Sequence, residues 1–451
     1  MSDHGLGPRY SETVSILDQA VADAHGAYAA ARPRSAAQAE AAARVLPAGS
    51  TRSVLDFDPF PFRVAKAEGS LLHDVDGFTY VDLLGDYTAG LFGHNPPEIA
   101  SAVQAVLDRG WSLGAIGDNE HRLAELLCAR FPSIEQIRFT NSGTEANLMA
   151  VSLARHGTGR TKVLVFDGAY HGGLLYFGPH GAPLRAPYEY VVCTYNDLGS
   201  VASAFDTEGS DIACVLIEPM MGAGGGIRGD LEFLTGLRRL CDANDTLLIF
   251  DEVMTSRMSI GGAQLRLGIT PDLTTLGKYL GGGMTFGAFG GSADLMGAFD
   301  PARRGSLTHG GTFNNNALTM GVGAVAVADL VTESALDRLY ERGEALRNRL
   351  SERGSRYGLQ ATGWGSILGI HATDREISTP ADLGSVDQRI GELLFHGLLT
   401  RGFYTARRGF IALSLAVTDE QLDGFLAAFD GVVHELSERS ILRESLTNLP
   451  P

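Results

Sequence analysis

The chain has little of what marks a secreted, membrane-bound or zinc-stabilised protein. Its 451 residues include only four cysteines. They are widely spaced and form no C-x-x-C pair, so we expect neither disulfides nor a metal site. No apolar run reaches the roughly 18 residues that a transmembrane helix needs, and the first residues lack the charged and apolar regions of a signal peptide. We therefore expect a soluble cytoplasmic protein without a bound metal.

Positive charge is also scarce. The chain has 36 Lys and Arg against 53 Asp and Glu, a net charge of −17, which argues against nucleic acid or an anionic membrane surface as the main partner. An anionic substrate would then need individually placed arginines. The 44% of hydrophobic residues and the 57 glycines are typical of a compact, turn-rich α/β enzyme.

The pattern of apolar residues divides the chain into three segments. Residues 1–90 combine alanine-rich helices with short strands, and Asp76-Gly77 predicts a hairpin there. Residues 91–332 alternate strands and helices, which predicts a large, mostly parallel sheet covered on both faces. Residues 333–451 return to an α+β pattern, so we expect both chain ends to form one smaller domain. Strands are expected at 62–67, 70–74, 79–84, 136–140, 162–167, 190–194, 213–218, 246–251, 273–276, 286–290, 365–371 and 410–415, and helices at 14–31, 35–45, 97–107, 121–130, 145–156, 231–243, 317–331, 334–353, 386–401 and 419–436.

A buried strand that ends in two carboxylates is the first candidate site. The apolar run 246–250 leads to Asp251 and Glu252, and open α/β sheets place ligands at such strand ends. The next strand leads to Lys278, whose glycine-rich, apolar surroundings should lower the pKa of the amine and make it nucleophilic. An acid for a pyridinium nitrogen and a lysine for a Schiff base suit pyridoxal phosphate (PLP). Taken alone, Asp251 could instead be a helix cap or a salt-bridge partner, and Lys278 could be a surface lysine.

Two more motifs lie at predicted strand ends. Ser142, Gly143 and Thr144 precede a helix, where free N–H groups and the helix dipole favour a phosphate. The same residues could form an ordinary N-cap. Tyr170 and His171 are flanked by glycines, and the Tyr170 ring could stack on a flat cofactor or pack on the core.

Three polar residues elsewhere have open roles. Thr312 follows two glycines before a helix, where its hydroxyl could contact a phosphate or the loop could satisfy its own backbone. Arg52 lies beside an aromatic cluster, and Arg408, next to Arg407, precedes a strand. Each guanidinium could clamp a carboxylate or be a solvated surface charge.

The run Gly224–Gly229 matches G-x-G-x-x-G, with Asp251 22 residues later (251 − 229). It is not a dinucleotide fingerprint, because residues 218–223 separate it from the strand and its last glycine precedes the expected N-cap, Asp230. A nicotinamide oxidoreductase is therefore disfavoured.

Taken in chain order, these motifs resemble the class III aminotransferases of the fold-type I PLP enzymes. The resemblance covers roughly residues 45–420. It rests on Ser142-Gly143-Thr144-Glu145-Ala146, Tyr170-His171, Glu218-Pro219, Asp251-Glu252-Val253, Gly277-Lys278 and Gly311-Thr312-Phe313. The β-phenylalanine aminotransferases and the glutamate-1-semialdehyde aminomutases look most similar. The stretches 138–150 and 282–291 favour the former, and the aminomutases typically read Asn-Ser-Pro-Val-Arg where this chain has Ser50–Val54.

The resemblance implies a role for each residue. Lys278 would form the Schiff base with PLP and move a proton between substrate and cofactor, while Asp251 would keep the pyridine nitrogen protonated. The other implied cofactor contacts are Ser142, Gly143 and Thr144 on the phosphate, Val253 and Tyr170 on the two ring faces, His171 and Glu218 nearby, and Thr312 of the partner subunit. Arg52, Arg408 and Met254 would contact the substrate, with Arg407 as an alternative to Arg408.

We therefore expect a homodimeric enzyme that moves the amino group of an aromatic β-amino acid to 2-oxoglutarate or pyruvate, with no nucleic-acid or membrane partner. One alternative is an intramolecular aminomutase or racemase on the same scaffold, which needs no keto acid. The other is a non-enzymatic relative that binds a ligand without turnover, which the presence of Lys278 and Asp251 disfavours.

Overall fold

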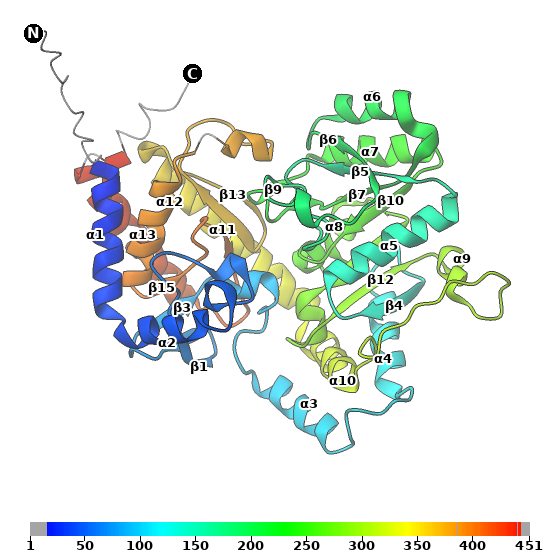
Figure 1. Cartoon of the computed structure of the whole chain (residues 1–451), viewed down its shortest axis with the longest axis horizontal. Helices are drawn as coiled ribbons and strands as arrows, with labels where there is room; N and C mark the ends of the chain where they lie inside the picture. Colours follow the sequence, from blue (N-terminus) through cyan, green and yellow to red (C-terminus); the bar gives the residue numbers. More distant parts are fainter. Residues whose placement is uncertain (1–15, 385, 440, 443–451) are drawn as a thin grey trace, which may run out of the picture.

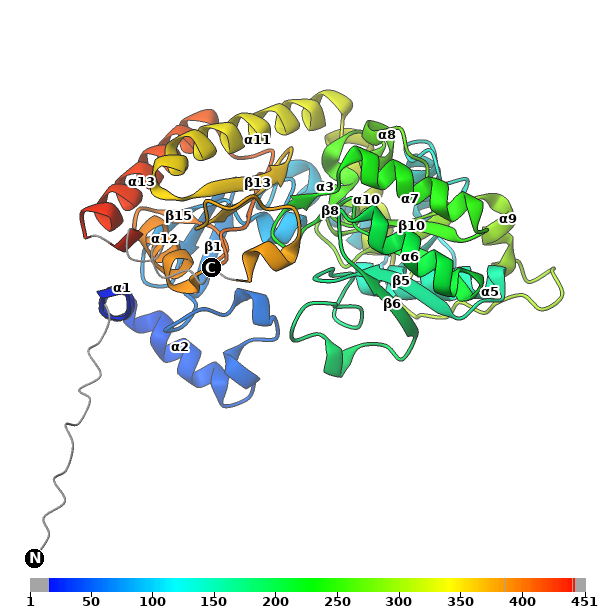
Figure 2. The same ribbon diagram turned by 90° about the horizontal axis from the view of Figure 1, so that it is seen from above.

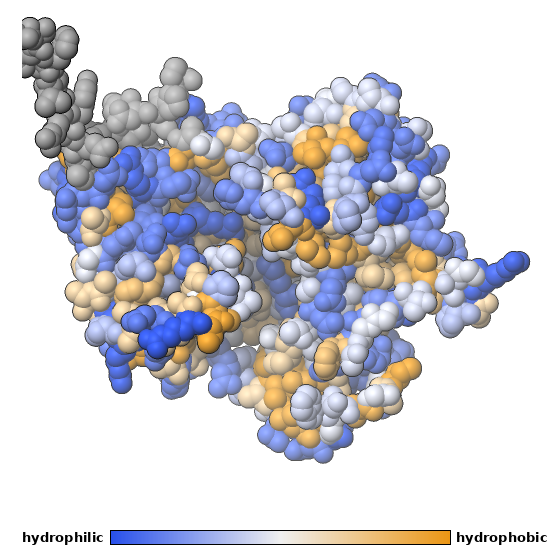
Figure 3. Space-filling view, viewed as in Figure 1, coloured by the Kyte–Doolittle hydropathy of each residue, from blue (hydrophilic) through white to orange (hydrophobic). Residues whose placement is uncertain are grey.

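The computed structural model describes residues 16–384, 386–439 and 441–442. Figure 1 shows two parts side by side, a larger one around a seven-stranded sheet and a smaller one that carries the helices near both chain ends. Helix α11 (Glu333–Gly354) runs along both parts, as the view from above in Figure 2 shows. The face in Figure 3 is hollowed between the two parts. Within the described residues no single helix is long and apolar enough to cross a bilayer.

The seven-stranded sheet has the order β4-β12-β11-β10-β7-β5-β6. Only β12 is antiparallel to its neighbours, so the mostly parallel α/β sheet predicted from the sequence is confirmed. Its strands are β4 (Gln136–Thr140), β5 (Lys162–Phe166), β6 (Glu189–Cys193), β7 (Ile212–Ile217), β10 (Leu247–Asp251), β11 (Leu273–Gly277) and β12 (Gly287–Gly291). The strands β7 and β11 are buried along their whole length, because helices cover them on both faces.

The helices of the larger part pack on this sheet and on one another. Helix α5 contacts five strands, from β4 to β7 in the sheet order, and so spans the middle of the sheet. The helices are α3 (Pro97–Leu107), α4 (Asp118–Cys128), α5 (Gly143–Thr158), α6 (Leu198–Glu208), α7 (Leu231–Ala243), α8 (Gly262–Leu267), α9 (Ala293–Met296) and α10 (Ala317–Val325).

The smaller part is built from segments far apart in the chain. One sheet has the order β1-β2-β3-β15, in which β15 from the C-terminal third runs parallel to β3. Its strands are β1 (Val64–Glu68), β2 (Leu71–Asp74), β3 (Thr79–Asp82) and β15 (Phe403–Tyr404). A second sheet consists of β13 (Gln360–Trp364), β14 (Ile367–His371) and β16 (Ile411–Ala412). The helices of this part, besides α11, are α1 (Ile16–Ala31), α2 (Pro33–Ala43), α12 (Gln388–Thr400) and α13 (Asp419–Glu438). The domain boundaries at 90/91 and 332/333 stay predictions.

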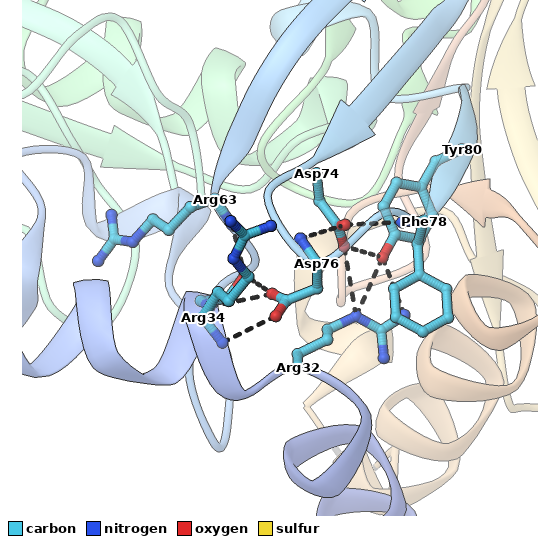
Figure 4. Close-up of polar contacts among 8 residues, drawn as sticks. Arg32, Arg34, Arg63, Asp74, Asp76, Phe78 and Tyr80 are labelled. Carbon is cyan, nitrogen blue, oxygen red and sulfur yellow. Dashed lines mark hydrogen bonds and ion pairs between the residues drawn. The ribbon is translucent and has the colours of Figure 1, made fainter.

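Helices α1 and α2 are attached to the first sheet by a buried polar cluster (Figure 4). The guanidinium of Arg32 donates to the Tyr80 hydroxyl and lies 3.7 Å from Asp74. The carboxylate of Asp76 accepts from the backbone N–H groups of Arg34 and Ser35, and so caps the start of α2 from the β2–β3 turn. This cap fixes the helix that leads to the Arg52 loop.

The structure also corrects several sequence-based boundaries. The predicted strand 365–371 starts at Ile367, because Gly365 lies in the turn of an unpredicted β13–β14 hairpin. Helices α6 and α8 and the two-residue strands β8 (Met220–Met221) and β9 (Ile227–Arg228) were not predicted. The Asp76-Gly77 hairpin is confirmed between β2 and β3. The predicted start of the first helix, Val14, lies outside the described residues.

Candidate active site

Five of the predicted motifs meet at one edge of the large sheet. Strands β4, β5, β7, β10 and β11 are parallel, so their carboxyl ends lie on the same side. The residues at or after the carboxyl ends of these strands are Ser142–Thr144, Tyr170–His171, Glu218, Asp251–Met254 and Lys278, in strand order. This is the edge at which parallel α/β sheets bind ligands.

Lys278 directly follows β11 with a φ of 57°, a left-handed conformation that is unusual for a residue with a Cβ. Its Nζ donates to the backbone carbonyl of Tyr87 at 2.5 Å. Burial lowers the pKa of this amine to about 8, although the carboxylates of Asp251, Asp86 and Glu218 act in the opposite direction. Roughly a tenth of the amine is therefore neutral and nucleophilic at pH 7, and half of it is neutral at about pH 8.

Asp251 is held by three groups at the end of β10. Its Oδ2 accepts from Asn147 Nδ2 at 2.8 Å and lies 2.8 Å from His171 Nδ1, while its Oδ1 accepts from the Val253 N–H at 3.0 Å. The Thr275 hydroxyl donates to Asn147 Oδ1 at 2.7 Å, which turns the amide N–H toward Asp251. The carboxylate is thus fixed in orientation at the sheet edge.

The loop before α5 forms an N-cap, one of the two interpretations of its sequence. Ser142 Oγ accepts from the Glu145 N–H at 3.2 Å. The N–H groups of Gly143 and Thr144 have no acceptor within the helix, so the helix end remains able to bind an anion. A Cβ on Gly143 would lie 2.7 Å from Val253 Cγ2, so only glycine allows Val253 to pack at this position.

The Tyr170–His171 loop is fixed against the neighbouring strand ends. Glu218 accepts from the backbone N–H groups of Tyr170 at 2.9 Å and Gly222 at 2.8 Å. Burial raises the pKa of Glu218 to about 7, against the opposing effects of His171 and these two N–H groups. Gly172 lies on the Thr144 hydroxyl, and a Cβ there would be 2.1 Å from it. The Tyr170 side chain is 44% exposed and lies beside the Tyr176 ring.

The two predicted substrate arginines approach the same aromatic ring. The Arg52 and Arg408 guanidinium carbons lie 6.0 and 5.5 Å from the centre of the Tyr87 ring. Arg52 pairs with Asp86 at 2.5 Å, and Arg408 donates to the Ala223 carbonyl at 3.2 Å. Arg408 also lines a cavity of about 220 Å³ next to the Tyr176 loop.

The other two substrate candidates are placed differently. Arg407 points away to Glu392, which its Nη1 contacts at 3.0 Å, so Arg408 and not Arg407 faces Tyr87. Met254 packs on Gly222, where a Cβ would lie 2.3 Å from its sulfur. This places Met254 next to the turn that Glu218 holds.

Among the described residues, the Thr312 side chain makes no hydrogen bond to these motifs. It is exposed, in a loop in which Asn314 Oδ1 accepts from Asn141 Nδ2 at 2.9 Å. Its contact with a phosphate, and the partner subunit that this contact requires, stay predictions.

Sequence reasoning missed four residues that hold the site together. Asn147 could have been found, because it lies one helical turn after Gly143. Thr275 lies inside a buried strand and carries no sequence signal. Asp86 and Tyr87 lie in an irregular turn, and their contacts with Arg52 and Lys278 depend on the tertiary fold.

The chemistry of these residues fits PLP. A desolvated amine, a strand-end carboxylate and a helix start with free N–H groups offer partners for an aldehyde, a pyridinium nitrogen and a phosphate. Within the described part of the chain, His171 Nε2 and Thr88 Oγ1 are buried without a hydrogen-bond partner, so both remain available to a bound molecule.

Comparison with known proteins identifies the family. The model of the class III aminotransferases matches residues 55–177 and 180–433. The β-phenylalanine transaminase of Variovorax paradoxus is 48% identical over 423 residues, which are 93% of this chain and 97% of that protein. The crystal structure of the β-phenylalanine aminotransferase from Variovorax paradoxus superposes with a TM-score of 0.92, at 47% identity, over 94% of this chain and 98% of that one.

Two more distant structures share the fold. An omega-transaminase from Sphaerobacter thermophilus is 34% identical, with a TM-score of 0.84 over 90% of this chain and 98% of that one. A glutamate-1-semialdehyde aminomutase from Pseudomonas aeruginosa is 24% identical, with a TM-score of 0.86 over 93% and 98%, and this likeness shows the fold alone. With a family match across most of its length, the chain belongs to the class III aminotransferases and is a PLP-dependent transaminase.

Proposed function

We propose that this transaminase takes the amino group of an aromatic β-amino acid, such as β-phenylalanine, and passes it to 2-oxoglutarate or pyruvate. The observation that carries the proposal is the pair of guanidiniums of Arg52 and Arg408 beside the Tyr87 ring. The backbone carbonyl of Tyr87 in turn accepts a hydrogen bond from Lys278. A transaminase binds two different carboxylates in turn at one site, and two arginines with different partners give each a place. The 48% identity to a β-phenylalanine transaminase supports the aromatic β-amino acid.

In this proposal the chain's own residues hold charge and move a proton. PLP, when bound, supplies the electron-withdrawing ring that stabilises negative charge at the substrate carbon. Asp251 presents its carboxylate at the sheet edge, and Lys278 Nζ takes up and returns the substrate proton. The partly buried position of Lys278 limits the access of water to that transfer.

We also propose a homodimer in which Thr312 of the partner subunit contacts the phosphate. The exposed position of Thr312 supports this contact. Large apolar side chains are also exposed, one next to Thr312 in the sequence and others around the α3–α4 connection, and such side chains are typical of protein–protein interfaces. These side chains are Trp111, Leu113, Ile116 and Phe313, together with Leu107 at the end of α3. Light scattering of the purified protein should give twice the mass of one chain, whereas a monomer would refute the dimer.

The test of the reaction is the absorbance of the PLP-loaded enzyme with β-phenylalanine alone. The visible band should disappear, one equivalent of keto product should form, and 2-oxoglutarate or pyruvate should restore the band. An unchanged band, with turnover of glutamate-1-semialdehyde in the absence of any keto acid, would instead establish the aminomutase. The Lys278→Ala variant is the control for changes that do not depend on catalysis.

A further inference from the structure

The turn between β3 and α3 has an unusual backbone. Gly85, Asp86, Tyr87 and Thr88 have φ angles of 52°, 45°, 51° and 78°, so four successive residues are left-handed and three of them carry a Cβ. Such a conformation is disfavoured and persists only where its surroundings impose it, which happens most often at functional sites.

Contacts from both neighbouring and distant residues hold this turn in place. Asp82 Oδ1 accepts from the N–H groups of Leu84 and Gly85 at 2.9 and 3.0 Å. The Ala412 carbonyl packs so closely that a Cβ on Gly85 would lie 2.6 Å from it. The Tyr87 hydroxyl donates to the Val54 carbonyl at 2.8 Å, just past Arg52. The turn is therefore a rigid block tied to both the Arg52 loop and strand β16.

Three groups of this turn are directed at the site or available to it. The Tyr87 carbonyl accepts from Lys278 Nζ, and Asp86 Oδ1 accepts from Arg52 Nη1, both at 2.5 Å. The Thr88 hydroxyl is buried and, among the described residues, has no partner. One short segment thus contacts both the lysine and a carboxylate-binding arginine.

The Asp86–Arg52 pair leaves most of the guanidinium free. Asp86 is the only hydrogen-bond partner of the Arg52 side chain within the described part of the chain, and it uses one of five N–H groups. The remaining N–H groups of the Arg52 guanidinium can therefore bind a substrate carboxylate bidentately. The side chains of both residues are about half exposed, 47% and 51%, so the pair adds little to folding stability.

We propose that Asp86 is a positioning residue that sets the distance between Arg52 and Lys278 and thereby favours β- over α-amino acids. This inference rests on the proposed function. A β-amino acid has one more carbon between its nitrogen and its carboxylate, which lengthens that span by up to about 1.5 Å, one C–C bond. A misplacement of about 1 Å can cost roughly 100-fold in rate, so a fixed arginine can separate the two classes.

The experiment compares kcat/KM for β-phenylalanine and for α-phenylalanine in the PLP-loaded wild type and variants. Asp86→Ala should lower kcat/KM for β-phenylalanine roughly ten-fold or more, the size of one charged hydrogen bond. The ratio of kcat/KM for β-phenylalanine to kcat/KM for α-phenylalanine should fall, mainly because KM for β-phenylalanine rises. Asp86→Asn keeps an acceptor for Arg52 and should restore most of the ratio. Asp337→Ala, which removes an equally exposed partner of Arg266, should change neither value.

The outcomes separate this inference from the proposed function. An unchanged ratio in Asp86→Ala, in an enzyme that transaminates β-phenylalanine, overturns the role of Asp86 alone. Loss of PLP from Asp86→Ala, measured by the visible band, also overturns it, because the turn would then support Lys278 and not Arg52. A wild type that does not accept β-phenylalanine overturns both.

Discussion

Asp251 and His171 form a buried pair, with the carboxylate Oδ2 2.8 Å from the imidazole Nδ1. Because the carboxylate is an acceptor, Nδ1 carries a proton in this contact, and Nε2 is buried without a partner among the described residues. His171 therefore helps Asn147 to orient Asp251 through Oδ2, while Oδ1 accepts from the Val253 N–H.

Replacing Asp251 tests whether its charge drives catalysis. In Asp251→Asn the side chain keeps its size but loses the charge that would hold a protonated pyridine nitrogen. We expect PLP to bind and kcat to fall by roughly 10²-fold or more, the usual loss when a charge-stabilising group is removed. Steady-state kinetics at matched PLP content measures this effect.

The companion substitution His171→Ala should have a smaller effect on kcat, because Asn147 still donates to the same oxygen. If His171→Ala lost all activity while Asp251→Asn stayed active, His171 and not Asp251 would be the group on which catalysis depends.

The neutral form of Lys278 sets the pH at which the protein captures its cofactor. Burial lowers the pKa of this amine to about 8, from an ordinary value of 10.5. Lys278 therefore loses its proton as the pH rises through about 8, and the rate of PLP capture by cofactor-free protein should rise there and level off below about pH 10. Stopped-flow absorbance over this range provides the measurement. A rate that still climbs above pH 10 would mean an ordinary, hydrated lysine.

The site edge could be predicted because buried strands are easy to locate. The apolar runs before Ser142, Asp251 and Lys278 fix where each strand ends, and a parallel sheet then gathers those ends together. The strand-end residues therefore needed no knowledge of distant contacts. The motif order added the identity of the cofactor.

The turn that carries Asp86 could not be predicted in this way. The turn packs at Gly85 against the Ala412 carbonyl, more than 300 residues further along the chain (412 − 85 = 327). No local preference of Asp86, Tyr87 or Thr88 signals its left-handed conformation, because residues with a Cβ favour other conformations. Similarly, the choice between Arg407 and Arg408 depends on Glu392, which lies on another element.

Glu392 should make part of the stability depend on pH. It lies 3.0 Å from His25 Nε2, 3.3 Å from His396 Nε2 and 3.0 Å from Arg407 Nη1. Burial alone would raise the pKa of this carboxyl, but the hydrogen bonds from His396, His25 and Arg407 outweigh it and lower the pKa from 4.5 to about 2. Its stabilisation is therefore fully present above about pH 4.5 and is lost as the pH falls toward 2.

The loss should amount to at most about 3 kcal/mol, the free-energy equivalent of that pKa difference. Urea midpoints at several pH values between 3 and 6 measure it. Glu392→Gln should be less stable than the wild type at pH 6, and the gap should close at low pH. Glu435→Gln, which removes an exposed partner of Arg401, is the control and should show a small, constant difference. A gap that does not narrow with pH would exclude the ionised Glu392 as the cause.

The last prediction separates the two adjacent arginines. Arg408 stacks near Tyr87 and Phe410 and lines the cavity of about 220 Å³, whereas Arg407 is paired with Glu392. Arg408→Ala should therefore weaken the binding of a carboxylate substrate by roughly 1.5–3 kcal/mol, one charged hydrogen-bonding interaction. Arg407→Ala should leave KM for both the amino acid and the keto acid nearly unchanged and lower only stability. Steady-state KM values for the two substrates distinguish the variants. If Arg407→Ala raised KM as much as Arg408→Ala did, Arg408 would have no special role in carboxylate recognition.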